Sequence, residues 1–453
     1  MIELKAVQRI FFIGIGGIGM SALARYFAFH GKSVSGYDRT ETGLTRELAR
    51  EGIPVFYEDD WERAPREVEW VIYTPAIPGD LNLLKQYRQN NYTVLKRSDA
   101  LGEITKSSFN ICVAGTHGKT TITTMIAHIL RNSGYGCNAF LGGIAANYNT
   151  NFWSNARNVC VVEADEYDRS FLKLNPDIGV ITAMDADHLD IYGDKKEVQE
   201  AFLEFSGKIK KDGLLISKKG LEREKELRGD NRLTYSLAYP DADVHAEKIR
   251  ITTGGYLFDV TMTDWRLENV ELQMGGLHNV ENVTAAISVA RRLGIGDEEI
   301  KKAVLEFKGV RRRFEYIVKD GNRVFIDDYA HHPEELRALI GSAKKLFPAM
   351  ECTVIFQPHL FSRTRDFAQE FAESLDLADE VILLPIYPAR ETPLEGVTSK
   401  LVYDRIIKAK KHLMNKEELL DWLKKKGTAV LITAGAGDID GLVEPIRKLL
   451  ENK

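Results

Sequence analysis

The chain has 453 residues, and at roughly 150 residues per domain this length predicts about three domains, each able to bury its own core. Hydrophobic residues make up 44% and charged residues 28% of the chain, which indicates a globular protein and excludes a disordered or fibrous one. The 61 basic and 66 acidic residues leave a formal net charge of −5, so no nucleic-acid partner is expected.

The cysteines and the apolar N-terminal stretch bear on the cellular compartment. Cys112, Cys137, Cys160 and Cys352 are far apart and form no C-x-x-C pair. They predict neither a disulfide framework nor a zinc site, and they favour a reducing cytoplasm. Four glycines interrupt the apolar stretch from Ile10 to Ala24, which therefore indicates a strand, a turn and a helix. We expect no export signal and no membrane partner.

Two α/β domains are predicted in the chain before residue 308. From Arg9 to Arg97, β-rich runs alternate with helical patterns, which indicates a parallel sheet, and we assign the first domain to residues 1–104. A new strand, a helix from about Lys119 to Arg131 and further strands predict a second domain over residues 105–308. Within it, residues 243–274 contain runs with an alternating pattern, separated by Gly-Gly and Thr-Asp turn signals, which is typical of a small antiparallel sheet.

A third α/β domain is predicted over residues 309–453. After a boundary near residues 307–315, β-rich runs return as RVFIDDY, CTVIFQP, EVILLPI and AVLITAG, with helical patterns between them. The expected fold class is therefore α/β with three domains, of which the middle one carries an antiparallel extension. No short repeat or low-complexity segment is present, which excludes a solenoid.

The first candidate site is a G-x-G-x-x-G motif that follows a predicted strand and opens a predicted helix. It comprises Gly14, Gly16, Gly17 and Gly19. Glycines let the backbone approach a diphosphate, whose charge is met by free amides and the helix dipole. Asp38 ends the next predicted strand, where a carboxylate can bind ribose hydroxyls. A tight turn without a ligand is the alternative for this motif.

The second candidate site, AGTHGKTT at residues 114–121, is the strongest signal in the chain. Successive amides from Thr116 to Thr120 can surround the β and γ phosphates of ATP. Lys119 can neutralise the transferred group, and the Thr120 hydroxyl can bind Mg²⁺. The usual P-loop has a glycine where this chain has Val113, so the loop is a shortened variant. An ATP-consuming enzyme is the leading class.

Two acidic segments, VVEADEYDRS and MDADHLD, follow predicted strands of the second domain and predict a magnesium site. We favour Glu163 and His188 as the ligands. Acidic residues at strand ends are otherwise solvated or cap helices, and we expect that ordinary role for Glu166, Asp168 and Asp190.

Further polar groups follow along the chain. His278, Asn279 and Asn282 lie on or just before a predicted helix, as helix caps or as contacts to a nucleotide. The third domain adds segments rich in basic residues and histidine, with Arg313, Glu315, Asp327, Asp328, His331, His332, Gln357, His359, Arg363 and Arg365. Adjacent histidines point apart, so His331 and His332 favour contact with an anion or a substrate over metal binding.

The motifs of this chain, taken in order, resemble the Mur ligase family along nearly the whole chain. They are GIGGIGMSALA, AGTHGKTT, VVEADEYDRSF, DADHLDIYG, GLHNVENVTAA, RRRFE, DDYAHHP, QPHLFSRTRDF, YPARETP and GAGDI. The resemblance is strongest to its alanine-adding branch. It implies an N-terminal Rossmann-like domain that binds a UDP-sugar, a central ATPase domain, and a C-terminal Rossmann-like domain that binds the amino acid. It implies that ATP phosphorylates the lactyl carboxylate of UDP-N-acetylmuramate and that L-alanine attacks the acyl phosphate, in peptidoglycan precursor synthesis.

The resemblance also implies residue roles. The UDP-sugar would contact Gly14, Gly16, Gly17, Gly19, Met20, Ser21 and Asp38. The phosphates of ATP would contact Gly115, Thr116, His117, Gly118, Lys119, Thr120 and Thr121. The rest of the nucleotide would contact His278, Asn279, Asn282, Arg313 and Asp328. Magnesium would take Thr120, Glu163 and His188 as ligands. The catalytic groups would be Lys119, His188, His331, His359 and Arg363.

This sequence departs from the family pattern at three places. Ala183 stands where the family often has Asn, and Leu360 stands where an arginine commonly follows the PH pair. No counterpart is evident for the lysine that sibling ligases carbamoylate. Three rival functions stay open: a recycling ligase that attaches a tripeptide to the same UDP-sugar, a nicotinamide-dependent dehydrogenase, and a non-catalytic nucleotide switch.

Overall fold

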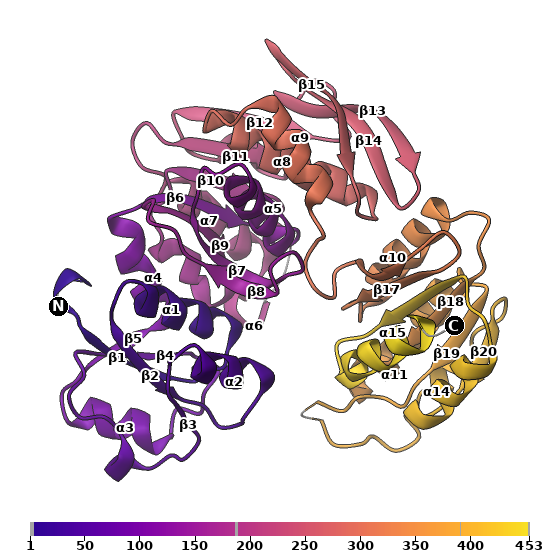
Figure 1. The fold of residues 1–453 in the computed structure, drawn as a ribbon, viewed down its shortest axis with the longest axis horizontal. Helices are drawn as coiled ribbons and strands as arrows, with labels where there is room; N and C mark the ends of the chain where they lie inside the picture. The colour runs from indigo at the N-terminus through magenta and orange to yellow at the C-terminus, as the bar shows by residue number, and fades with distance from the viewer. Residues whose placement is uncertain (1–3, 186–188, 390, 452–453) are drawn as a thin grey trace. The chain divides into compact units, whose positions relative to one another are not determined.

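The computed structural model describes residues 4–185, 189–389 and 391–451. The chain, drawn as a ribbon in Figure 1, divides into two compact units that are each described by themselves. Unit 1 comprises Met1–Glu247, Val260–Leu267 and Glu281–Ala303, and unit 2 comprises Lys248–Asp259, Glu268–Val280 and Val304–Lys453. The three sheets that the sequence predicted are present, two of them mainly in unit 1 and the third in unit 2.

The first sheet is fully parallel, with strand order β3-β2-β1-β4-β5. Its strands are β1 (Arg9–Ile13), β2 (Ser33–Tyr37), β3 (Val55–Phe56), β4 (Trp70–Tyr73) and β5 (Thr93–Lys96). The helices of this part are α1 (Ile18–Phe29), α2 (Gly43–Arg50), α3 (Asn82–Gln89) and α4 (Arg97–Lys106), with 3-10 turns η1 (Leu4–Ala6) and η2 (Trp61–Arg63). The strand order reverses at β1 and β4, and open α/β sheets bind ligands at such a point.

The second sheet has ten strands in the order β15-β14-β13-β12-β11-β10-β6-β9-β7-β8. Its parallel part contains β6 (Phe109–Ala114), β7 (Asn138–Ala145), β9 (Val159–Ala164), β10 (Ile178–Ile181), β11 (Leu214–Lys218) and β12 (Asn231–Ser236), while β8 (Thr150–Trp153) pairs antiparallel with β7. Nearly every residue of β6, β9 and β10 is buried, as expected for strands of a sheet that helices cover on both faces. The helices are α5 (Lys119–Asn132), α6 (Leu189–Tyr192), α7 (Lys195–Ser206), α8 (Leu277–Arg292) and α9 (Asp297–Glu306), with η3 (Tyr167–Lys173) and η4 (Glu224–Glu226).

The predicted antiparallel extension is present as three neighbouring strands at one edge of this sheet. They are β13 (Val244–Thr252), β14 (Gly255–Met262) and β15 (Trp265–Leu272). Two-residue turns join each strand to the next, a connection that only antiparallel strands allow.

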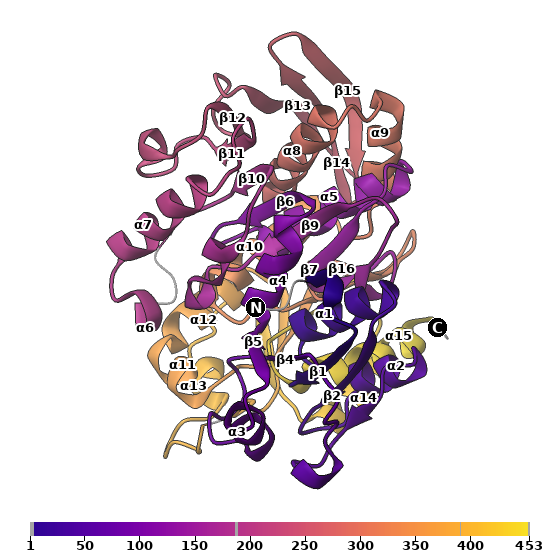
Figure 2. The same ribbon diagram turned by 90° about the vertical axis from the view of Figure 1, so that its left-hand side faces the viewer.

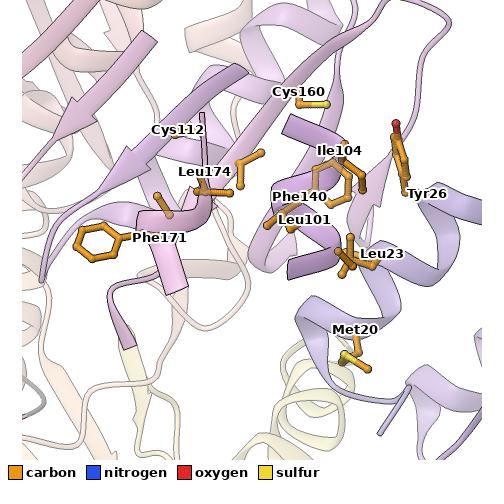
Figure 3. Close-up of a cluster of buried hydrophobic side chains, with 14 of the residues drawn as sticks. Met20, Leu23, Tyr26, Leu101, Ile104, Cys112, Phe140, Cys160, Phe171 and Leu174 are labelled. Carbon is orange, nitrogen blue, oxygen red and sulfur yellow. The ribbon is translucent and has the colours of Figure 1, made fainter. Parts of the chain in front are cut away.

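Unit 1 has a core that runs without a break from the first sheet into the second. Helix α1 packs on β7 and β8 as well as on β2 (Figure 1, Figure 2). Figure 3 shows Leu23 and Tyr26 of α1 beside Phe140 of β7 and Leu101 and Ile104 of α4, all of them buried. The boundary proposed after residue 104 therefore falls inside α4, because Ile104, 1% exposed, belongs to this core rather than to a polar linker.

The third sheet has the order β16-β17-β21-β18-β19-β20, with only β16 antiparallel to its neighbour. Its strands are β16 (Glu315–Lys319), β17 (Val324–Asp328), β18 (Cys352–Phe356), β19 (Glu380–Leu383), β20 (Lys410–Leu413) and β21 (Val430–Ala434). The helices are α10 (Pro333–Leu346), α11 (Phe361–Asp366), α12 (Ala368–Leu375), α13 (Lys400–Tyr403), α14 (Lys416–Lys425) and α15 (Val443–Glu451), with η5 (Asp438–Leu442). Pro333 is the first residue of α10. The backbone amides of His331 and His332, which precede the helix, donate to the Glu335 carboxylate in its first turn.

All four cysteines are free and buried. No helix within the described ranges combines the length and the apolar character that crossing a bilayer requires.

Candidate active site

The loop between β6 and α5 has the backbone geometry of a phosphate-binding loop, as the sequence predicted. Gly115 and Gly118 adopt φ values of +140° and +79°, which residues with a side chain rarely adopt. A Cβ atom on Gly115 would lie 2.0 Å from Thr182 Oγ1, so the loop also needs glycine for space. Because α5 begins at Lys119, the loop amides stand at a helix N-terminus, which attracts a phosphate.

Lys119 is held between this loop and a buried carboxylate. Its Nζ donates to the Gly115 carbonyl oxygen at 2.6 Å and to Glu166 Oε1 at 2.8 Å. Burial raises the pKa of Glu166, which is 1% exposed, and the Lys119 ammonium opposes that effect. The prediction that Glu166 is solvated or caps a helix is therefore wrong. The side chain makes no capping hydrogen bond and lies inside, where the lysine compensates its charge.

Thr120 and Glu163 bring two side-chain oxygen atoms together beside the loop. Thr120 Oγ1 donates to Glu163 Oε1 at 3.0 Å, and the Gly142 amide donates to Glu163 Oε2 at 3.0 Å. A Cβ atom on Gly142 would lie 2.3 Å from the carboxylate oxygens, so this glycine leaves the room that Glu163 occupies. Hard oxygen donors suit Mg²⁺, which typically takes only one or two protein ligands, so this pair fits that ion.

The remaining predicted metal ligand, His188, lies outside the described residues, as does Asp187. The side chains of Asp168 and Asp190 are also outside the described part. Within the part of the chain that the structure describes, no group of three or more His, Cys, Asp and Glu side chains is arranged to hold a metal ion.

A cavity of about 480 Å³ in unit 1 joins the glycine-rich loop to Glu163. It opens where the strand order of the first sheet reverses, between the segments that follow β1 and β4. Of the predicted UDP-sugar contacts, Gly17, Gly19 and Met20 line it. A single cavity therefore reaches from a diphosphate-type loop to the carboxylate beside the P-loop.

The other predicted UDP-sugar contacts have partners within the fold. Asp38 Oδ2 accepts from the Gly16 amide at 2.7 Å, which orders the glycine-rich loop. Gly14 has a φ of +85° and its amide donates to the Tyr37 carbonyl oxygen at 2.7 Å. Ser21 is fully buried and its hydroxyl donates to the Ile18 carbonyl oxygen at 2.9 Å. None of these four residues lines the cavity.

Arg97 is a cavity residue that sequence reasoning missed. It opens α4 directly after β5, and its Nη2 lies 3.7 Å from Asp165 Oδ2, which also lines the cavity. A Cβ atom on Gly19 would lie 2.5 Å from Arg97 Nη1, so the guanidinium stands over the glycine-rich loop. The available signal was a basic residue at the carboxyl end of a parallel strand.

The predicted nucleotide contacts have different surroundings in the structure. Asn282 lies over it, since a Cβ atom on Gly118 would be 3.1 Å from Asn282 Oδ1. Thr116 donates its amide to the Ala183 carbonyl oxygen at 3.3 Å, so the main chain at Ala183 holds the loop. The His117 side chain is 75% exposed. Thr121 is buried in α5, and Asn279 donates to the Gly275 carbonyl oxygen at 2.6 Å. His278 lies against Gly276.

In unit 2, Arg312 of the RRRFE segment, rather than Arg313, takes part in a network of polar contacts around the buried Asp327. Arg312 Nε lies 3.3 Å from Asp327 Oδ2, and Thr433 Oγ1 donates to Asp327 Oδ1 at 2.6 Å. Arg313 is exposed. Asp328 accepts from the Phe314 amide at 2.6 Å and from the Ala330 amide, so it organises the loop after β17. Burial raises the pKa of Asp327 to about 7 and that of Asp328 to about 6.

His359 and Arg363 form a second polar group, at the carboxyl end of β18. The His359 ring lies 6.0 Å from the His331 ring and stacks on Tyr387 at 5.8 Å. Burial, Arg363 and His331 lower the pKa of His359, which favours its neutral form. His359 Nδ1 and Arg363 Nη1 are buried and have no hydrogen-bond partner among the described residues. Buried polar atoms of this kind are costly unless a ligand satisfies them, so they indicate a binding site.

The departure at Leu360 is accommodated by the backbone. Its φ of 68° is unusual for a residue with a side chain, and its amide donates to the Tyr387 carbonyl oxygen at 3.0 Å. Arg365, 55% exposed, pairs with Asp366, so Arg363 supplies the buried positive charge of α11.

The raised pKa of Asp327 predicts a pH-dependent stability. The folded state holds this proton up to about pH 7, whereas an unfolded Asp loses it near pH 4, so the free energy of unfolding falls as pH rises through that window. We expect the free energy of unfolding of Asp327→Asn, taken relative to that of the unsubstituted protein, to be higher at pH 7.5 than at pH 5 by more than about 1 kcal/mol. Urea unfolding at the two pH values measures this. The exposed Asp366→Asn is the control, and a difference independent of pH contradicts the prediction.

Three family models match successive parts of the chain. The Mur ligase family catalytic domain matches residues 9–109, the Mur ligase middle domain residues 113–290, and the Mur ligase glutamate ligase domain residues 312–437. The UDP-N-acetylmuramate–L-alanine ligase of Phocaeicola vulgatus is 47% identical to this chain, with all of both chains covered. The chain belongs to the Mur ligase family.

Other Mur ligases are similar over the same length. The UDP-N-acetylmuramate–L-alanine ligase of Flavobacterium johnsoniae is 45% identical, with 99% of each chain covered. The crystal structure of the UDP-N-acetylmuramate–alanine ligase of Thermotoga maritima superimposes with a TM-score of 0.83 at 30% identity, covering 98% of this chain and 99% of that one. A murein peptide ligase from Psychrobacter arcticus, 20% identical with a TM-score of 0.66, shares the fold.

Proposed function

We propose that this Mur ligase joins L-alanine to the lactyl carboxylate of UDP-N-acetylmuramate, with ATP converted to ADP and phosphate, in peptidoglycan precursor synthesis. The observation that carries the proposal is the cavity in unit 1. It brings a diphosphate-type glycine-rich loop and the carboxylate beside the P-loop into one space. A nucleotide sugar bound at the glycine-rich loop can therefore extend its own carboxylate toward the transferred phosphate. Relatives of the same length that are 45–47% identical carry names of this activity.

The chemistry follows from the poor reactivity of a carboxylate toward amines. A carboxylate oxygen attacks the γ-phosphorus and ADP leaves, with Lys119 placed to offset the charge of the transferred group. The amine then attacks the acyl carbon, phosphate leaves with the C–O electrons, and the amine loses a proton. Neutral His359 is suited to accept a hydrogen bond or a proton from the amine, and Arg363 is suited to bind its carboxylate.

The test is ADP release measured with UDP-N-acetylmuramate and each candidate amine. We expect release to require ATP, Mg²⁺, UDP-N-acetylmuramate and L-alanine together, with L-serine and glycine weaker because a pocket for one methyl group discriminates only modestly. A higher kcat/KM with L-Ala-γ-D-Glu-meso-diaminopimelate would assign the recycling activity instead. ATP turnover without the sugar nucleotide would contradict both. The dehydrogenase is not favoured, because it leaves the P-loop and its carboxylates unexplained. A non-catalytic nucleotide switch is not favoured, because it would need no C-terminal domain with buried polar groups such as His359 and Arg363.

We propose Thr120 and Glu163 as Mg²⁺ ligands with His188, the ion serving to offset phosphate charge. Glu163→Gln should raise the Mg²⁺ concentration for half-maximal activity by about tenfold, because the site relies on few protein ligands. A magnesium titration of ADP release measures this shift. Glu197→Gln, an exposed surface partner of Arg169 in the same unit, is the control. If both variants reached half-maximal ADP release at the same Mg²⁺ concentration, Glu163 would not be a magnesium ligand and would have a structural role only.

We also propose the division into functional segments 1–104, 105–308 and 309–453, for the UDP-sugar, ATP and the amino acid. The three family models, at 9–109, 113–290 and 312–437, support this division. We propose the cytoplasm as the location, which the four free, buried thiols support because thiols persist in a reducing compartment.

A further inference from the structure

The carboxylate side chains of the segment Glu163–Glu166 point in different directions. Glu163 and Asp165 line the cavity. Glu166 does not line it, and its side chain is 1% exposed. Its oxygens lie 2.8 and 2.7 Å from Lys119 Nζ, and the Tyr192 hydroxyl donates to its main-chain oxygen at 2.6 Å. Glu166 is therefore turned away from the sugar-nucleotide site and toward the P-loop lysine.

The lysine ends in an ammonium group with three N–H donors, and the structure shows where two of them point. One donates to the Gly115 carbonyl oxygen at 2.6 Å and another to Glu166. Because an ammonium group is roughly tetrahedral, two fixed hydrogen bonds also set the direction of the third N–H. A lysine side chain otherwise carries about 2 kcal/mol of rotamer entropy, so an isolated lysine would not hold a single direction.

We propose that Glu166 is the positioning residue of Lys119, a buried carboxylate that holds the ammonium so that its remaining N–H meets the transferred phosphoryl group. The role rests on the proposed function for the identity of the phosphoryl acceptor. Glu166 itself acts through the lysine and does not touch the substrate.

Two opposing consequences follow from the charge of Glu166, and they give the proposal a distinctive signature. The carboxylate directs the lysine, which lowers the barrier to phosphoryl transfer, because misplacing a catalytic group by about 1 Å can cost on the order of 10²-fold in rate. The same negative charge weakens the attraction of Lys119 for the phosphates of bound nucleotide. Removing only the charge should therefore slow turnover while leaving nucleotide binding as tight or tighter.

The test compares the full-length protein with Glu166→Gln, Lys119→Ala and the double variant. For Glu166→Gln we expect kcat for ADP release to fall by about 10²-fold. Its Kd for ADP, measured by calorimetry in EDTA, should stay equal or fall by up to about tenfold. In the Lys119→Ala background the same substitution should change the ADP Kd by less than about twofold, because the group through which Glu166 acts is gone.

The matched control is Asp177→Asn. Asp177 pairs with Lys210 at 2.8 Å in the same unit, but it precedes β10 and so lies at the opposite end of the strands from the P-loop. It should change neither kcat nor the ADP Kd. If Glu166→Gln does not fold, Glu166→Asp keeps the charge and withdraws it from the lysine, and it should lower kcat by at least tenfold without weakening ADP binding.

Three results would overturn the proposal. They are a kcat within threefold of the unsubstituted protein, a parallel loss of kcat and ADP affinity, and a change of more than about twofold in the ADP Kd that is the same with and without Lys119. The ADP measurements need no sugar nucleotide or amine. Absence of L-alanine ligation by the unsubstituted protein would therefore overturn the proposed function and leave the coupling between Glu166 and Lys119 measurable.

Discussion

Replacing Lys119 with alanine is expected to lower ADP-forming turnover by about 10³-fold or more, the largest effect of any single side chain in unit 1. The ammonium is the positive charge of the P-loop, and it stands at the start of α5 with its position fixed by Gly115 and Glu166. The variant should also lose about 3–5 kcal/mol of stability, because it removes the ammonium that compensates the charge of the buried Glu166.

ADP release and urea unfolding measure the two effects separately. Lys210→Ala is the control, since Lys210 forms a comparable ion pair with Asp177 away from the P-loop. It should lose some stability and keep its turnover. A Lys119→Ala variant that is folded and retains more than a tenth of the turnover would show that the loop does not act on the transferred phosphate.

Arg363→Ala is expected to raise the KM for L-alanine by about 10²-fold and the KM for ATP by less than about threefold. The reason is the buried Nη1, which has no protein partner among the described residues and can therefore bind the amino acid's carboxylate. A hydrogen bond between charged groups contributes about 1.5–3 kcal/mol, or roughly 10- to 150-fold in affinity, and the burial of this contact places the expected effect in the upper part of that range.

The chain supplies a matched control two residues away on the same helix. Arg365 is 55% exposed and paired with Asp366, so Arg365→Ala should change neither constant appreciably. Initial rates at varied L-alanine and varied ATP separate the two constants. Equal effects of the two substitutions, or a larger effect on ATP than on alanine, would remove Arg363 from the amino-acid site.

Local patterns in the sequence were sufficient to predict most of the buried strands and the phosphate loop, but not β7 and β12, which lie inside the second sheet. The apolar runs of β1, β6, β9, β18 and β21 are buried on both faces, and such strands stand out from their neighbours in composition. The short or polar edge strands β3, β16 and β20 escaped detection, because an edge strand needs little burial and so has a weak pattern.

The sequence by itself determined the α/β class, the P-loop with Lys119 and Thr120, and the order of the motifs, since these depend on neighbours along the chain. Only the tertiary structure decided which polar side chains meet. It placed Glu166 against Lys119, Arg97 over Gly19, and Arg312 rather than Arg313 beside Asp327. It also joined residues 1–104 and most of residues 105–308 in one compact unit, through the packing of α1 and α4. The physical reason is that a residue's burial and charge partner come from segments distant in sequence, which no local spacing encodes.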